Sequence, residues 1–337
     1  MSKIENRKAE HVDIVAKDAS MDRRKFYFDD IHLTHRALPE ISLKDVDPSI
    51  EFLGKKLSFP FLISSMTGGS DEAIHTINHN LARAAEAEGV AMGVGSQRVM
   101  FHDPAARSSF ELRGFAPHAL LFANLGAVQL NEGMAFDQIH DAVDVLKADA
   151  LILHLNPLQE VVQPEGDTDF SNLWKKMAEV FQGLEKPVIV KEVGAGISRA
   201  DAELLIKAGV KIIDVAGAGG TSWSRIEAAR SGDPSLGELF QDWGIPTPQA
   251  LRELSDMDVT LIASGGIRTG IDMAKAIILG ASLCGMARPL LTPAMESVDA
   301  VRAVIQRIRK EFITAMFLLG VENVEQLQGN RSLIVAE

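Results

Sequence analysis

A short apolar run that ends in polar residues, LILHLNPLQEVVQPEGD at positions 151–167, could supply chemistry. Side chains alternate across a β-strand, so His154 and Asn156 would share one face. Both can donate hydrogen bonds to phosphate oxygens, and Glu160 is a hard oxygen ligand of the kind that holds magnesium together with substrate phosphates. The other interpretation is that Asn156, Gln159 and Glu160 only cap and solvate a turn.

Two glycine-rich segments could hold a phosphate group. In SGGIRTG (264–270), Thr269 would open a helix whose free amides and dipole favour an anion, and Arg268 adds a positive charge. GAGGTS (217–222) is a second such segment, and glycines let a backbone approach a ligand closely. The alternative is that the glycine pair of the first segment only turns the chain.

Basic residues near the N-terminus could join the same site. The segment RKAEH offers Arg7, Lys8 and His11 at helical spacing, and GSQR ends in Arg98. A charged run at a terminus is usually only a solvated tail. It gains a role in binding if the terminal segment folds over the site.

Composition and charge limit the class of protein. The chain has 337 residues, of which 46% are hydrophobic, so it can bury a large core. The formal net charge of −12 disfavours nonspecific attraction to nucleic acid or anionic membranes, and we expect neither as a partner. A single cysteine, Cys284, excludes an intramolecular disulfide and any cysteine-rich metal site. The charged N-terminus and the lack of a membrane-spanning apolar run predict a cytoplasmic protein.

Eight apolar runs rich in branched residues alternate with segments of helical periodicity, and each run predicts a buried parallel strand. The runs are FPFLISS from Phe59, VAMGVGS from Val90, ALLFANLG from Ala119, DALILHLN from Asp149, PVIVKEV from Pro187, KIIDVAGAG from Lys211, VTLIASGG from Val259 and ASLCGMA from Ala281. Eight strand–helix units predict a closed (β/α)8 TIM barrel at 59–337, after an N-terminal extension at 1–58. A doubly wound open sheet is the alternative.

Several residues predict where helices begin and end. Ser198 and Thr269, each followed three residues later by an aspartate, predict helix starts, and Gly209 and Gly320 predict left-handed ends. In a barrel the carboxyl ends of all strands meet at one rim, where barrels place their active sites. We therefore expect the extension to cover this rim.

Lys191 follows the apolar run PVIV and is unusual there. It is either a charge in the barrel interior near the rim or a side chain that reaches outward between helices. In the interior, a lysine can balance the negative charge of an electron-rich ring or a phosphate. The alternative role is a salt bridge with a neighbouring residue.

The segments RKAEH, SSMTGG, GVGSQR, FANLGA, HLNPLQE, VKEVG, GAGGTS, ASGGIRTG and MARP together resemble the type 2 isopentenyl diphosphate isomerases, the flavin-dependent class of that enzyme. The resemblance is collinear from about Arg7 to about Gly320. HLNPLQE and SMTGG are specific to this class, whereas the glycine-rich segments are shared with the wider group of FMN-binding barrels.

The resemblance implies an enzyme of isoprenoid biosynthesis that interconverts isopentenyl and dimethylallyl diphosphate with reduced FMN as acid and base. It implies NADPH as the reductant, although the reaction has no net redox change, and a homo-oligomer, either a tetramer or an octamer. Gln159 would lie near the reacting carbons and act in catalysis with His154. Glu160 would hold Mg²⁺ against the diphosphate.

The resemblance also implies two sets of binding residues. The diphosphate substrate would contact Arg7, Lys8, His11, Arg98, His154, Asn156 and Gln159. The flavin would contact Ser65, Met66, Thr67, Ser96, Asn124, Lys191, Thr221, Gly265, Gly266, Arg268, Ala287 and Arg288.

Two rival functions share parts of this pattern. An FMN-dependent 2-hydroxy-acid oxidase has the same barrel and phosphate segments, but it uses a histidine in the loop after the sixth strand, and GAGGTSWSR contains none. A noncatalytic phosphate-binding barrel would not explain HLNPLQE together with the basic N-terminus.

Overall fold

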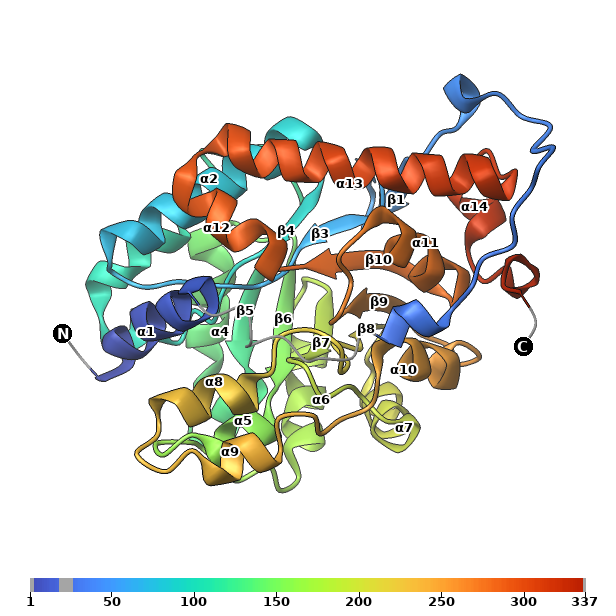
Figure 1. Cartoon of the computed structure of the whole chain (residues 1–337). Helices are drawn as coiled ribbons and strands as arrows, with labels where there is room; N and C mark the ends of the chain where they lie inside the picture. Colours follow the sequence, from blue (N-terminus) through green and yellow to red (C-terminus); the bar gives the residue numbers. More distant parts are fainter. Residues whose placement is uncertain (1–2, 18–26, 336–337) are drawn as a thin grey trace.

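The strands form one closed barrel in the computed structural model, which describes residues 3–17 and 27–335 (Figure 1). All eight predicted strands are confirmed, and each pairs in parallel with its neighbours. They are β3 (Phe61–Ile63), β4 (Ala91–Gly93), β5 (Leu121–Gly126), β6 (Ala150–Leu155), β7 (Val188–Glu192), β8 (Ile212–Asp214), β9 (Thr260–Ser264) and β10 (Ala281–Met286). The last strand closes on the first, with Cys284 opposite Phe61, which excludes the open doubly wound sheet.

Helices surround the barrel, and shorter helices lie in the loops between strand and helix. The helices are α1 (Lys3–Lys17), α2 (Glu72–Glu88), α3 (Val99–His102), α4 (Phe136–Leu146), α5 (Pro157–Val162), α6 (Leu173–Gly183), α7 (Arg199–Ala208), α8 (Trp223–Arg230), α9 (Ser235–Leu239), α10 (Thr247–Leu254), α11 (Gly270–Ile278), α12 (Arg288–Glu296), α13 (Val298–Leu319) and α14 (Val324–Leu327). After β4, only α3 and a 3₁₀ segment, Pro104–Phe110, stand where a longer helix was expected. Pro104 has no amide hydrogen, so α3 cannot continue through it.

The predicted helix ends are confirmed. The side chain of Ser198 accepts a hydrogen bond from the Asp201 amide at the start of α7, and Thr269 does the same with Asp272 at the start of α11. Gly209 and Gly320 end α7 and α13 in the left-handed conformation. Local sequence therefore determines where these helices begin and end.

Strand alternation divides the apolar core into two parts. Ile152 packs inside the barrel with residues such as Phe122 and Ile189. Leu151 and Leu153, on the other face of the same strand, pack in the larger cluster between the barrel and its helices. The polar residues that continue the Ile152 face therefore emerge at the carboxyl end of the barrel interior.

The N-terminal extension contacts the barrel at both ends. Helix α1 lies against α8 and α12 at the rim (Figure 1). Further along, Lys275 of α11 donates a hydrogen bond to the Phe28 carbonyl at 2.8 Å. The hairpin of β1 (Ile50–Phe52) and β2 (Lys55–Leu57) closes the opposite end, where the Lys55 ammonium lies 2.9 Å from Asp149.

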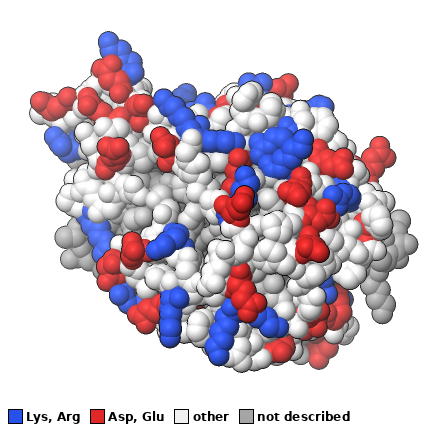
Figure 2. Space-filling model, turned by 180° about the vertical axis from the view of Figure 1, so that it is seen from behind, with Lys and Arg blue, Asp and Glu red and all other residues white. Residues whose placement is uncertain are grey.

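The surface carries charge of both signs. Figure 2 shows acidic and basic side chains interspersed over one face rather than gathered in a single tract. No helix within residues 3–17 and 27–335 is both long and apolar enough to cross a membrane.

The close packing of α11 on α13 gives a test of the fold. A Cβ added at Gly270 would lie 2.2 Å from the backbone nitrogen of Phe312. We expect Gly270→Ala to lower the free energy of unfolding by about 1–3 kcal/mol because the two helices must move apart. Urea unfolding measures this, with Gly232→Ala as the control, since a Cβ there meets nothing within 4 Å. Equal midpoints for both variants would contradict the packing.

Candidate active site

The carboxyl ends of all eight strands and helix α1 surround a single cavity of about 580 Å³. The predicted site residues whose side chains the structure describes line this cavity without exception. They are Lys8, His11, Ser65, Met66, Thr67, Ser96, Arg98, Asn124, His154, Asn156, Gln159, Glu160, Lys191, Thr221, Gly265, Gly266, Arg268, Ala287 and Arg288. Arg7 belongs to α1, but its side chain lies outside the described part of the chain.

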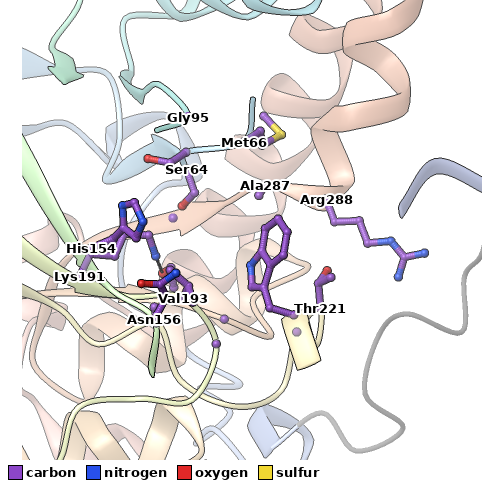
Figure 3. A pocket seen from close by; sticks show the side chains of 18 of the residues that line it. Ser64, Met66, Gly95, His154, Asn156, Lys191, Val193, Thr221, Ala287 and Arg288 are labelled. Atoms are coloured by element: carbon purple, nitrogen blue, oxygen red, sulfur yellow. Dashed lines mark hydrogen bonds between the residues drawn. The ribbon is translucent and has the colours of Figure 1, made fainter. Parts of the chain in front are cut away.

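The cavity has two distinct sides. In Figure 3, His154, Asn156 and Lys191 lie together, whereas Met66, Ala287 and Arg288 lie on the opposite side. Val12 and Val15 of α1 add apolar lining. The site therefore has a polar group at the ends of β6 and β7, and a second wall formed by β3, β10 and the N-terminal helix α1.

The two glycine-rich segments pack backbone against backbone. A Cβ at Gly265 would lie 2.1 Å from the Gly217 carbonyl oxygen, so only glycine fits there. The guanidinium of Arg268 donates to the carbonyls of Gly266 and Gly219, each at 2.7 Å, and joins the two segments. This packing and the positive φ of Gly265 and Gly266, +92° and +76°, require glycine whether or not a ligand is bound. The free amides expected at the start of α11 are engaged within the protein, because the Arg268 and Thr269 amides donate to Asp272 and the Gly270 amide donates to Glu311.

Helix α12 completes this cradle. Its N-cap is Ala287, whose side chain cannot accept a hydrogen bond. Pro289 has no amide hydrogen and the Leu290 amide donates to the Ala287 carbonyl at 2.9 Å, so this helix start offers few amides to an anion. Arg288 begins the helix and also lines the cavity, and its positive charge suits a phosphate group.

Three side chains that line the cavity carry buried hydroxyl groups. The hydroxyl oxygens of Ser64, Ser65 and Thr67 have no hydrogen-bond partner within the described residues, although all three side chains line the cavity. Buried polar groups are nearly always hydrogen-bonded, so these atoms fit a polar ring ligand. Together with the cradle, the donors present fit FMN.

His154 is held by one amide. Its Nδ1 lies 2.8 Å from Asn124 Oδ1, and Asn124 Nδ2 donates to the Val94 carbonyl at 2.9 Å. The second bond fixes the Asn124 amide with its oxygen toward the imidazole. His154 Nδ1 therefore carries the hydrogen, and the ring presents Nε2 toward Gly126.

Glu160 is a buried carboxylate with both oxygens engaged. Asn156 Nδ2 donates to one oxygen at 2.7 Å, and the Asp167 amide donates to the other at 2.8 Å. No group of three or more His, Cys, Asp or Glu side chains suited to a metal exists among the described residues. One carboxylate fits a magnesium ion that takes its remaining ligands from water and phosphates, as Mg²⁺ commonly does.

Gln159 is positioned by a carboxylate that the sequence analysis missed. Gln159 Nε2 donates to Glu227 Oε1 at 2.8 Å, and His11 Nε2 lies 3.0 Å from the same oxygen. Arg230 donates to the other oxygen at 2.5 Å. Glu227 is fully buried on α8, so it links α1 to the polar wall of the site.

Two further acidic residues were missed. Asp167 accepts a hydrogen bond from Arg98 at 2.7 Å, and Asp214 lies opposite Lys191 on the adjacent strand. Lys191 therefore forms a salt bridge with a neighbouring residue and also lines the cavity, so both interpretations of this residue hold. The sequence offers one signal for Asp214, which is a charged residue within the otherwise apolar run IIDV of a predicted strand.

The whole chain is similar to a family of isomerases. "Isopentenyl-diphosphate delta-isomerase" from Hydrogenovibrio crunogenus is 53% identical over 339 residues, which cover 99% of each chain. The protein of the same name from Paracoccus zeaxanthinifaciens is 54% identical, over 98% of this chain and 97% of that one. The chain belongs to the isopentenyl-diphosphate delta-isomerase family. The resemblance predicted from the sequence is confirmed. It extends to the protein of the same name from Methanosarcina barkeri, at 47% identity over 97% of this chain and 91% of that one.

This isomerase family shares its fold with flavin enzymes. The family model for FMN-dependent dehydrogenase matches residues 2–110 and 129–335. A flavocytochrome b2 mutant with sulfite bound is similar at a TM-score of 0.69 and 19% identity, over 98% of this chain and 82% of that one. A mandelate oxidase mutant with an FMN adduct is similar at a TM-score of 0.63 and 20% identity, over 95% of this chain and 90% of that one. At these identities the structures support the fold alone.

The burial of His11 and the ionised state of Glu227 predict that acid weakens the docking of α1. Burial lowers the pKa of His11 below 6.5, so the docked helix favours the neutral imidazole. As the pH falls below 6.5, protonation of His11 therefore opposes the docking of α1. Burial also opposes the charge on Glu227, but His11, Gln159 and Arg230 outweigh it and hold its pKa at about 2 rather than 4.5. The stability from ionised Glu227 is present above pH 4.5 and is lost as the pH falls toward 2.

Trp223 can report this change because its ring lies 5.1 Å from that of His11. In a variant with Trp174 and Trp243 replaced by phenylalanine, we expect the Trp223 fluorescence to change as the pH is lowered from 6.5 to 4. The added substitution His11→Gln removes one titrating group and should remove the upper part of this transition. Constant fluorescence in the parent variant would contradict the role of the pair.

Proposed function

We propose that this protein interconverts isopentenyl diphosphate and dimethylallyl diphosphate with bound FMN and Mg²⁺. The observation that carries the proposal is one cavity in which an FMN cradle adjoins the polar group His154, Asn156, Gln159 and Glu160. The names of the relatives similar over nearly the full length support it further.

The cradle residues bind and orient the cofactor. Gly265, Gly266, Arg268 and the start of α12 would hold its phosphate, while Ser65 and Thr67 would satisfy polar atoms of its ring. The remaining flavin contacts are proposed for Met66, Ser96, Asn124, Lys191, Thr221, Ala287 and Arg288. FMN, when bound and reduced, would supply the acid and base groups for the isomerisation.

The polar wall and α1 bind the diphosphate. Arg7, Lys8, His11 and Arg98 supply positive charge or donors, and His154 and Asn156 add hydrogen bonds. Glu160 would complete the binding through Mg²⁺.

The reaction needs one proton added and one removed. A proton joins the terminal alkene carbon, and another leaves the carbon nearer the diphosphate, so atoms and charge balance without net oxidation. Gln159, held by Glu227, would lie against the reacting carbons. Val12, Val15 and Trp223 line the cavity and would exclude water from the positively charged carbon centre.

Two rival functions receive less support. Residues 215–246, the connection after β8, contain no histidine, which a 2-hydroxy-acid oxidase would require there. A noncatalytic phosphate-binding barrel would not require the hydrogen bonds that fix His154, Gln159 and Glu160.

The proposal includes the cellular setting. NADPH would reduce the flavin, and the buried Cys284 gives no reason to require an oxidising compartment, in keeping with the cytoplasm. The side chains of Leu239 and Trp243 are 77% and 64% exposed, and they offer apolar surface for contact between subunits. The homo-oligomer would be either a tetramer or an octamer.

Proton NMR under anaerobic conditions tests the reaction. Purified protein with FMN, magnesium and a small amount of NADPH should convert isopentenyl diphosphate to dimethylallyl diphosphate far beyond the NADPH consumed. The control lacks reductant and should show no conversion. A reduced, bound flavin without isomerisation would remove the substrate assignment but keep the cofactor.

Gln159→Ala tests the catalytic wall. We expect turnover to fall by about a hundredfold or more, while flavin binding, measured by fluorescence, stays unchanged. The exposed Gln249→Ala on α10 is the matched control. Native turnover in Gln159→Ala would show that the reacting carbons lie elsewhere.

Glu160→Gln tests the proposed metal ligand. The magnesium concentration for half-maximal activity should rise by about tenfold or more, because one charged ligand is lost. Glu165→Gln, an exposed carboxylate that pairs with Arg230 at 3.4 Å, is the control. An unchanged magnesium requirement would remove Glu160 from the metal site.

A further inference from the structure

Three neighbouring strands bring a charged pair together in the barrel interior. Lys191 of β7 stands opposite Asp214 of β8 in the strand register, and its ammonium lies 3.2 Å from Asp214 Oδ2. The side chains are only 10% and 1% exposed. Lys191 lines the cavity, whereas Asp214 lies behind it.

Ser264 of β9 joins the two charges. Its hydroxyl donates to Asp214 Oδ1 at 2.7 Å and accepts from the Lys191 ammonium at 3.2 Å. The ammonium also donates to the Glu192 carbonyl at 2.9 Å. Two of its three donors are therefore fixed by the wall, and Asp214 flanks it on a further side.

The opposite charges of Lys191 and Asp214 largely cancel, so the pair produces only a weak electric field in the cavity. A lone buried ammonium beside a flavin would favour added electrons and would favour loss of the proton from the reduced ring, because both changes bring negative charge close to it. A carboxylate directly behind the ammonium offsets that field. The pair also spares the ammonium the cost of burial without a counter-charge.

We propose that Asp214 is a positioning residue that acts through Lys191 to moderate the positive field at the bound flavin ring. It fixes where the ammonium stands and keeps the reduced ring able to hold the proton it must give up in turnover. Asp214 does not touch the cavity, so this effect is electrostatic and not one of contact.

The midpoint potential of bound FMN tests this without turnover. We expect Asp214→Asn to raise the potential by about 30 mV or more, a tenfold shift toward reduced flavin for a two-electron couple. The absorption spectrum of the reduced protein should also shift toward the anionic form of the flavin at fixed pH. Potential and spectrum equal to those of the native protein would overturn the inference.

A matched control separates this effect from general damage. Asp149 pairs with Lys55 at 2.9 Å and with Arg113 at 2.8 Å at the other end of the barrel. Asp149→Asn removes a comparable charge far from the cavity and should leave the flavin potential unchanged. An equal rise in both variants would contradict a specific role for Asp214.

The double variant keeps the test decisive if Asp214→Asn alone does not fold. Lys191→Met leaves the carboxylate alone and should lower the potential. Adding Asp214→Asn to Lys191→Met removes both charges and should return the potential toward the native value. A double variant equal to Lys191→Met would overturn the inference.

The inference rests on the proposed flavin site, and the outcomes remain distinguishable. Failure of FMN to bind the native protein would count against the proposed function. FMN that binds with the same potential in the native protein and Asp214→Asn would count only against the role of Asp214.

Discussion

Closure of eight parallel strands is the constraint on which the site depends. Pairing of β10 with β3 brings all carboxyl ends to one rim, so residues from opposite ends of the sequence, such as Met66 and Arg288, line one cavity. The strands are buried on both faces and can afford few polar side chains. Two of the charged residues within them, Lys191 and Asp214, meet as a pair across two adjacent strands.

Much of the fold was predictable because its signals are local. Apolar runs predicted the eight strands, and Ser198, Thr269, Gly209 and Gly320 marked helix ends by chemistry that acts within one turn. The segment after β4 departed from the pattern because Pro104 stops α3. The hairpin of β1 and β2 was not predicted, since its strands are short and partly exposed.

The site was only half visible in the sequence. Among its donors, His154 and Lys191 stand at the ends of recognisable strands, and Gln159 follows one of them on α5. The carboxylates that hold Gln159 and Lys191 do not share those segments: Glu227 reaches Gln159 across 68 positions. Such partners follow from the way the chain closes in space, and only the register of β7 against β8 reveals that Asp214 faces Lys191.

The contact of α1 with α8 and α12 has a consequence for synthesis of the chain. Translation produces α1 long before the helices that receive it, so Val12 and Val15 reach their partly buried positions only after the barrel has closed. A chain that stops before β10 has α1 and α8, but it lacks α12 and the strand that closes the barrel. The cavity therefore has its full wall only once β10 and α12 have been added to the chain.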